Sequence, residues 1–161
     1  MQPKSNTSIF TQSLQLALCG NKLLAEYFTR KHNVNIKEEW ISTAKMVDTL
    51  CHMEEKVGAA TVHKVGAHIA SIAQGPHQLG RNSFQKFLVE DLNEVYRHNH
   101  QLMHEGFKIS TDGTNFYLNL MDNPYPLSFN KGLISGFSFR HNTLNNIYQV
   151  DKEILKIEKV I

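Results

Sequence analysis

The sequence lacks several features that would place it in a well-defined class of protein. It has two cysteines in 161 residues, and Cys19 and Cys51 have no metal-binding spacing between them. No apolar run approaches the roughly 18 residues of a membrane span, and residues 1–8 lack the apolar core of a secretory signal. Lysine and arginine are scattered, and the formal net charge is +2. We therefore expect a cytoplasmic protein with no membrane span, no nucleic-acid partner and two buried free thiols.

Catalytic motifs are also missing. There is no GxSxG nucleophile motif, no glycine-rich phosphate loop after a strand and no HExxH zinc motif. The sequence therefore names no catalytic residue. It leaves an enzymatic function open without favouring it.

Histidine, in contrast, is abundant, with nine in the chain. His100 and His104 lie one helical turn apart, but a zinc site needs three or four ligands, so we expect no metal site. A lone histidine such as His68 could ligate haem, although no CxxCH motif accompanies it. No cofactor is firmly implied, and haem or another tetrapyrrole remains an alternative.

The first two thirds of the chain show helical periodicity. The predicted helices run from about Ser8 to Phe28 with a break at Gly20-Asn21, from about Glu38 to Lys56, from Thr61 to Ala73, and from a Ser83 cap to about His104. Asn99 falls near the centre of the apolar face of the last of these. A buried amide needs hydrogen bonds, so Asn99 is expected to hold a neighbouring backbone or to point into a pocket.

The last third changes pattern. Residues 107–111 and 115–121 read as strands joined by an Asp112-Gly113 turn. Two prolines then hold Tyr125 in an extended path, and Ser128 is expected to cap a helix over 129–139. Gly132 and Gly136 in that helix indicate close approach of another backbone or a ligand.

Two strands are predicted in the tail, around 147–150 and 154–161, with a C-terminal helix as the alternative. The order of elements predicts one α+β domain over residues 1–161: an antiparallel sheet with several helices packed on it.

Three segments together resemble the bacterial 4-vinyl-reductase-like family of ligand-binding domains. They are Val57-Gly-x7-Gly66, Tyr96-x-x-Asn99-His100, and Asn123-Pro-Tyr-Pro-x-x-Phe129-x-x-Gly132. The resemblance covers roughly residues 40 to 140. It implies a fold like that of TRAPP components and haem-NO-binding-associated proteins, with small-molecule sensing and homodimer formation.

The chain departs from this family at two places. Leu127 stands where many relatives have a cysteine, and the tail over 142–161 has no cysteine for the zinc-binding hairpin that many relatives carry. We therefore transfer no metal site from the family.

The leading hypothesis is a stand-alone sensory or regulatory domain that binds a small hydrophobic or aromatic molecule and signals through a protein partner. The pocket is expected between the sheet and the long helices, because ligand pockets are mostly apolar with a few placed polar groups. Its expected ligand-binding residues are aromatic, amide and imidazole side chains: Trp40, Tyr96, Asn99, His100, Phe107, Tyr117 and Tyr125.

Two alternatives remain. The chain could be a ligand-free homodimeric interaction module that presents exposed apolar residues of its first helix, such as Phe10 and Leu14. It could instead be a haem- or metal-binding protein, as the histidine content allows.

Overall fold

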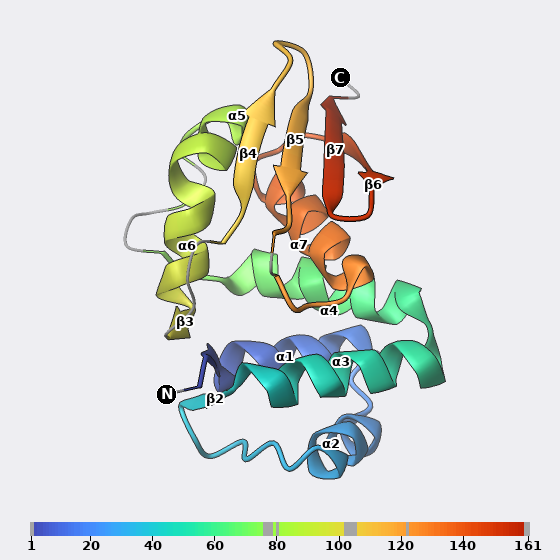
Figure 1. Ribbon diagram of the computed structural model, residues 1–161. Helices are drawn as coiled ribbons and strands as arrows, with labels where there is room; N and C mark the ends of the chain where they lie inside the picture. Colours follow the sequence, from blue (N-terminus) through green and yellow to red (C-terminus); the bar gives the residue numbers. More distant parts are fainter. Residues whose placement is uncertain (1, 76–78, 80, 102–105, 122, 160–161) are drawn as a thin grey trace.

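The computed structural model describes residues 2–75, 79, 81–101, 106–121 and 123–159 (Figure 1). The helices are α1 (Thr7–Ala17), α2 (Lys22–Lys31), α3 (Thr43–Val57), α4 (Ala59–Ile72), α5 (Phe84–Lys86), the π-helical turn η1 (Phe87–Asp91), α6 (Leu92–His98) and α7 (Leu127–Arg140). The strands are β1 (Lys4–Asn6), β2 (Trp40–Ser42), β3 (His100–Gln101), β4 (Lys108–Thr111), β5 (Phe116–Asn119), β6 (Asn145–Asp151) and β7 (Ile154–Lys159).

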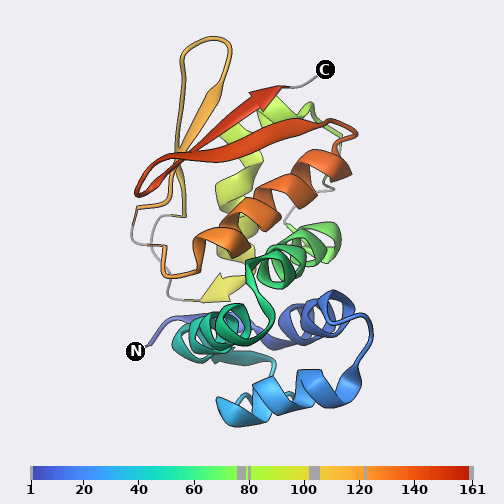
Figure 2. The ribbon, with the colours of Figure 1, turned by 90° about the vertical axis from the view of Figure 1, so that its right-hand side faces the viewer.

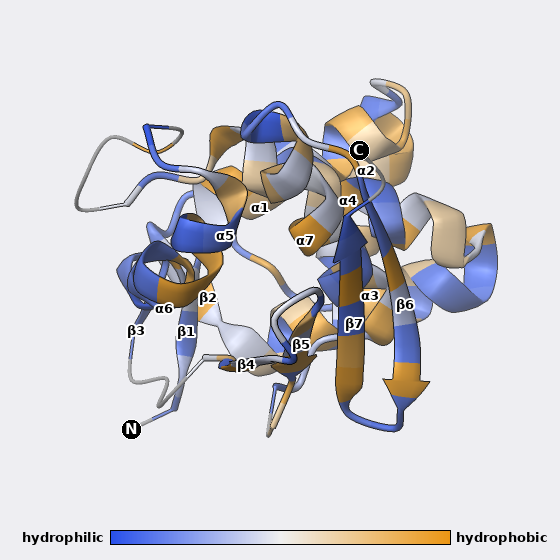
Figure 3. Cartoon of the chain, turned by 90° about the horizontal axis from the view of Figure 1, so that it is seen from above, coloured by the Kyte–Doolittle hydropathy of each residue, from blue (hydrophilic) through white to orange (hydrophobic). Residues whose placement is uncertain are grey.

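The larger sheet is antiparallel, in the order β4-β5-β7-β6. Leu118 of β5 opposes Leu155 of β7, and both are fully buried. Polar residues alternate with these apolar ones along β7 (Figure 3), so one face of the sheet lies against the core and the other faces outward. The prediction of an α+β fold with helices packed on an antiparallel sheet is confirmed.

Helices α7, α4, α1, α3 and α2 form a stack beneath this sheet, and α5 and α6 stand beside β4 (Figure 1 and Figure 2). Helix α7 lies next to the sheet, α4 crosses α7, α1 and α3 lie on the far side of α4, and α2 lies outermost. A second, small sheet in the order β2-β1-β3 joins distant parts of the chain, because Ser5 pairs with both Ile41 and His100.

Helices α4 and α7 touch through their backbones at three glycines. A Cβ atom added to Gly132 would lie 1.9 Å from the carbonyl oxygen of His63, and one added to Gly66 would lie 2.2 Å from that of Phe129. Gly136 is equally confined, with the Ala67 carbonyl oxygen 2.6 Å away. The expected close approach at Gly132 and Gly136 is confirmed, and the neighbour is another helix.

Arg140 fastens the end of α4 to α7. Its Nη1 donates hydrogen bonds to the carbonyl oxygens of Ala70 (3.0 Å) and Ala73 (2.7 Å). These carbonyl groups lie at the C-terminal end of α4, where the last carbonyl groups of a helix have no intrahelical donor. The positive guanidinium also lies at the negative end of the helix dipole.

Replacing this guanidinium should weaken the fold. We expect Arg140→Met to lower the free energy of unfolding by about 2 kcal/mol, because hydrogen bonds to charged groups contribute about that much. Urea denaturation would measure the loss, with Arg97→Met at an exposed position of α6 as the control. Equal stabilities of the two variants would contradict the assigned role.

Several predicted boundaries were wrong. The helix expected from Glu38 begins only at Thr43, because residues 40–42 form β2 in register with β1. The helix expected to reach His104 ends at His98, and residues 102–105 lie outside the described part of the chain. Ser128 does not cap α7: Pro126 precedes the helix, and the Ser128 hydroxyl instead donates to Glu54.

Of the predictions for the C-terminal tail and for the exposure of particular side chains, some are confirmed and others were wrong. The two C-terminal strands are confirmed, with β7 described to Lys159, and the helical alternative was wrong. Both cysteines are exposed, so the expectation of buried thiols was wrong. Phe10 and Leu14 are fully buried and cannot form the docking surface considered for them. Among the described helices, none is long and apolar enough to cross a membrane.

Candidate functional site

The candidate site is a partly open cavity of about 50 Å³, lined mainly by helices. Its walls come from β1, α1, α3, α4, α6, β3 and α7, together with Ala73, Asn99, Phe107 and Tyr125, which lie between these elements. The four strands of the larger sheet contribute no lining residue, so the cavity lies among the helices. The expected location, between the sheet and the long helices, was wrong. The lining is apolar except for one corner, which is formed by Ser5, Asn6, Tyr96, Asn99, His100 and Tyr125.

A chain of hydrogen bonds forms this polar corner. The Thr43 hydroxyl lies 2.8 Å from that of Ser5, which lies 2.9 Å from the Tyr125 hydroxyl. The Tyr125 hydroxyl lies 2.6 Å from Nε2 of His100, whose Nδ1 lies 2.7 Å from the Tyr96 carbonyl oxygen. The chain connects β1, the start of α3, the segment before α7 and the end of α6, which come from four distant parts of the sequence.

Local sequence holds Tyr125 in place. Pro124 and Pro126 restrict the backbone on either side, and the Tyr125 amide donates to Oδ1 of Asn123 at 3.0 Å in an Asx turn. The buried amide of Asn130 donates to the Tyr125 carbonyl oxygen at 3.2 Å. The ring is 5 % exposed, so its hydroxyl depends on Ser5 and His100 for hydrogen bonds.

His100 is held in the neutral form. Burial lowers the pKa of His100 to about 4, against a smaller opposite effect of its hydrogen bond to the Tyr96 backbone. A carbonyl oxygen can only accept, so Nδ1 of the neutral ring carries the proton and Nε2 accepts from the Tyr125 hydroxyl. The Tyr125 oxygen can then accept from Ser5, and Ser5 from Thr43.

Tyr96 forms the wall beside this imidazole. Its ring stacks on His100 with centroids 4.2 Å apart and meets Phe107 edge-on at 5.5 Å. Burial, followed by the neighbouring Tyr125, holds the pKa of the Tyr96 hydroxyl well above its usual range. The hydroxyl is therefore a neutral group that can donate or accept a hydrogen bond.

Five of the seven residues named from the sequence line this cavity: Tyr96, Asn99, His100, Phe107 and Tyr125. Asn99 ends α6, and its Nδ2 donates to the carbonyl oxygens of Gln74 and Val95, both at 2.8 Å. Of the two roles considered for its amide, the structure therefore shows it holding a neighbouring backbone.

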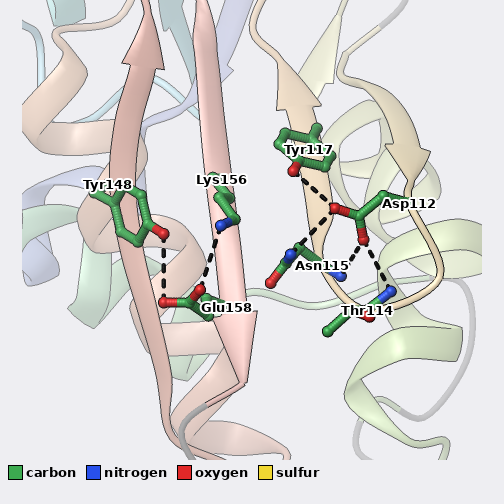
Figure 4. A network of polar contacts seen from close by, with 7 residues as sticks. All are labelled: Asp112, Thr114, Asn115, Tyr117, Tyr148, Lys156 and Glu158. Carbon is green, nitrogen blue, oxygen red and sulfur yellow. Dashed lines mark hydrogen bonds and ion pairs between the residues drawn. The ribbon is translucent and has the colours of Figure 1, made fainter.

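The other two named residues lie elsewhere. Trp40 is in β2, opposite Asn6, and does not line the cavity. Tyr117 lies on the outward face of β5, where its hydroxyl donates to the Asp112 carboxylate at 2.8 Å (Figure 4). Backbone hydrogen bonds from Asn115 and Thr114 hold the pKa of that carboxyl well below its usual range. This network stabilises the β4–β5 turn.

Sequence reasoning named His100 but missed the other side chains around the Tyr125 hydroxyl. Ser5 lies before the first helix, and Thr43 lies at the start of a helix that was expected to begin five residues earlier. Met46, whose Sδ is 3.8 Å from the Tyr125 hydroxyl, looked like an ordinary core residue. No local pattern marks these residues, because the pairing of β1 with β2 and β3 brings them together.

The described residues contain no cluster of three or more histidine, cysteine, aspartate or glutamate side chains that could hold a metal ion. His63 and His68 are on α4 and do not line the cavity. His104 lies outside the described residues. Of the histidines in the described part of the chain, only His100 reaches the cavity.

Haem does not fit the cavity as it stands. Neutral imidazole is a suitable axial ligand for haem iron, but Nε2 of His100 already accepts the Tyr125 hydroxyl proton. The volume of about 50 Å³ is also far below the roughly 300–1,000 Å³ of pockets that hold drug-sized ligands. A porphyrin would require both a wider cavity and the release of Tyr125.

Comparison with known proteins identifies the fold. No family model matches the chain, nor does any curated protein sequence. A mutant of the H-NOX protein of T. tengcongensis has a TM-score of 0.69 at 14 % identity, with 96 % of each chain covered. An oxygen-binding H-NOX domain related to soluble guanylate cyclases, solved as its oxygen complex, has a TM-score of 0.60 at 12 % identity and covers 96 % of this chain and 93 % of its own.

A third solved structure, from work on haem redox potential and porphyrin distortion, has a TM-score of 0.65 at 14 % identity and covers 95 % of this chain and 96 % of its own. At these identities the likeness concerns the fold alone. The resemblance to 4-vinyl-reductase-like and TRAPP-like domains was wrong, because the similar structures are H-NOX domains.

Proposed function

We propose that residues 1–161 form a sensory domain that binds a small, largely apolar molecule in the cavity beside Tyr96, His100 and Tyr125. The observation that carries this proposal is the apolar cavity with one polar corner, built by side chains from four distant parts of the sequence. Such a combination of apolar walls and few polar groups is typical of small-molecule sites. Action in the cytoplasm through a protein partner is part of the same proposal.

The cavity limits the size of the ligand. Its volume of about 50 Å³ is roughly a third of the 150 Å³ engineered cavity that takes up benzene. A molecule of a few heavy atoms fits without rearrangement. A hydroxyl or other donor on that molecule would replace Tyr125 at His100 Nε2.

Thermal melting with alcohols of a few heavy atoms tests this proposal. A molecule that binds the native state raises the melting temperature, and a filled cavity should abolish that rise. Ala73 is buried and lines the cavity, so Ala73→Val is the filling variant. Ala60→Val, at an exposed position of α4, the helix that ends just before Ala73, is its control. The proposal fails if no compound raises the melting temperature, or if Ala73→Val responds as the control does.

Haem binding is the second candidate, favoured by the neutral state of His100 and by the fold shared with H-NOX domains. His100 is the residue that would hold the iron once the cavity widened. Bound haem would supply a site for a diatomic ligand. Titration with hemin separates the two candidates: a Soret band lost in His100→Ala favours haem, and its absence in the unmodified protein removes this candidate.

A further inference from the structure

The outer edge of β6 is an unprotected strand edge. The larger sheet ends in β4 on one side and β6 on the other (Figure 1). Within the described residues, β6 pairs with β7 alone, so its other edge presents free backbone N–H and C=O groups. Such an edge is a template for another strand.

Natural sheets protect their edges with short strands, lysine, proline or bulges. β4 follows this rule, since it has four residues and begins at Lys108. β6 has seven residues, contains no lysine, arginine or proline, and has its irregularity only at its end, between Gln149 and Asp151. Residues 145–149 therefore form a regular edge without a charged side chain.

Exposed apolar side chains flank this edge. Leu144 is 65 % exposed, Tyr148 36 % and Val150 48 %. Tyr148 lies on the outward face, where its hydroxyl meets Glu158 and its ring meets Lys156 of the neighbouring strand (Figure 4). Lys156 and Glu158 of β7 thus pair with each other, one strand away from the edge.

We propose that β6 binds β6 of a second copy of this chain, antiparallel, to form one sheet across a two-fold axis. A second copy is the partner that we infer, because residues 145–149 carry no charged side chain. Antiparallel pairing of residues 145–149 with themselves places only Asn, Ile, Tyr and Gln side chains opposite one another, with no like charges in contact. A two-fold interface uses the same patch on both subunits, and this segment is complementary to itself.

Lysine placed in this segment tests the proposal. Asn146 is exposed, so Asn146→Lys introduces a charge into each copy at the paired edge with little expected effect on the fold. Ser110→Lys is the control on the opposite edge, β4, where the residue is also exposed. Sedimentation equilibrium should show the unmodified protein passing from 18.4 kDa to twice that mass as its concentration rises.

We expect Asn146→Lys to raise the dimer dissociation constant at least about tenfold, which corresponds to about 1.4 kcal/mol, and Ser110→Lys to leave it unchanged. Amide exchange over 145–149 should slow with concentration in the unmodified protein. A monomer at every soluble concentration, or an equal effect of both lysines, would overturn the proposal. Melting curves confirm that each variant is folded before its mass is measured.

Discussion

Gly132→Ala is expected to destabilise the protein by about 3 kcal/mol, the upper end of the usual cost of overpacking a core. The new Cβ would lie 1.9 Å from the His63 carbonyl oxygen, and neither helix backbone can move without disturbing the other glycine contacts. In an open helix the same change would stabilise by about 1 kcal/mol, because alanine forms helices better than glycine. Whether Gly132→Ala lowers or raises the free energy of unfolding therefore shows whether the backbone contact between Gly132 and His63 exists.

Chemical denaturation of Gly132→Ala measures this effect. Ser135→Ala, on the same helix at a half-buried position, is the control and should change the free energy of unfolding by less than about 0.5 kcal/mol. A stabilised Gly132→Ala protein would show that α4 and α7 are further apart than the structure places them.

Acid should remove a stabilising contribution of His100. Its pKa is about 4 in the folded protein and about 6.5 when unfolded, so the unfolded state binds the proton more readily between these values. The contribution is complete above pH 6.5, declines as the pH falls toward 4 and is absent below that. The difference of about 2.5 in pKa corresponds to a contribution on the order of 3 kcal/mol.

His100→Gln removes this titration while keeping a polar side chain. We expect the free energy of unfolding of the unmodified protein to fall more steeply between pH 7 and 4.5 than that of the variant. The pKa values of His32 and His63 are also lowered by burial, but both residues remain in the variant, so the difference between the two curves isolates His100. Parallel curves would show that the imidazole is accessible to solvent.

The fold was predictable where local chemistry determines it. The Asp112-Gly113 turn and the alternating tail specified two hairpins, and two glycines one helical turn apart marked the α4–α7 crossing. The family resemblance failed because it depended on short proline and glycine spacings. Those spacings reflect local backbone requirements that different folds share.

The site was predictable only in part. Of the residues named from the sequence, Tyr96, Asn99, His100 and Tyr125 line the cavity, but the helix that carries Tyr96 is not the continuous α-helix assumed for its helical wheel. The π-helical turn over 87–91 adds one residue to that helix, which rotates everything after it by roughly 100°. Trp40 was misassigned because the short strand that contains it depends on pairing with residues 4–6, more than thirty positions away.

With a neutral His100 protonated at Nδ1, the hydrogen bonds from Thr43 to the Tyr96 carbonyl oxygen all run in one direction. If the cavity binds a ligand as proposed, this direction would make the polar corner selective for hydrogen-bond donors. The imidazole nitrogen at the cavity offers only a lone pair, so a guest with acceptors alone gains nothing by displacing Tyr125. A ligand with an O–H or N–H group can donate to His100 Nε2 and so replace the hydrogen bond of the displaced Tyr125 hydroxyl. Binding at this corner would thus depend on whether the ligand has a hydrogen-bond donor, while the apolar walls would limit the size of the ligand.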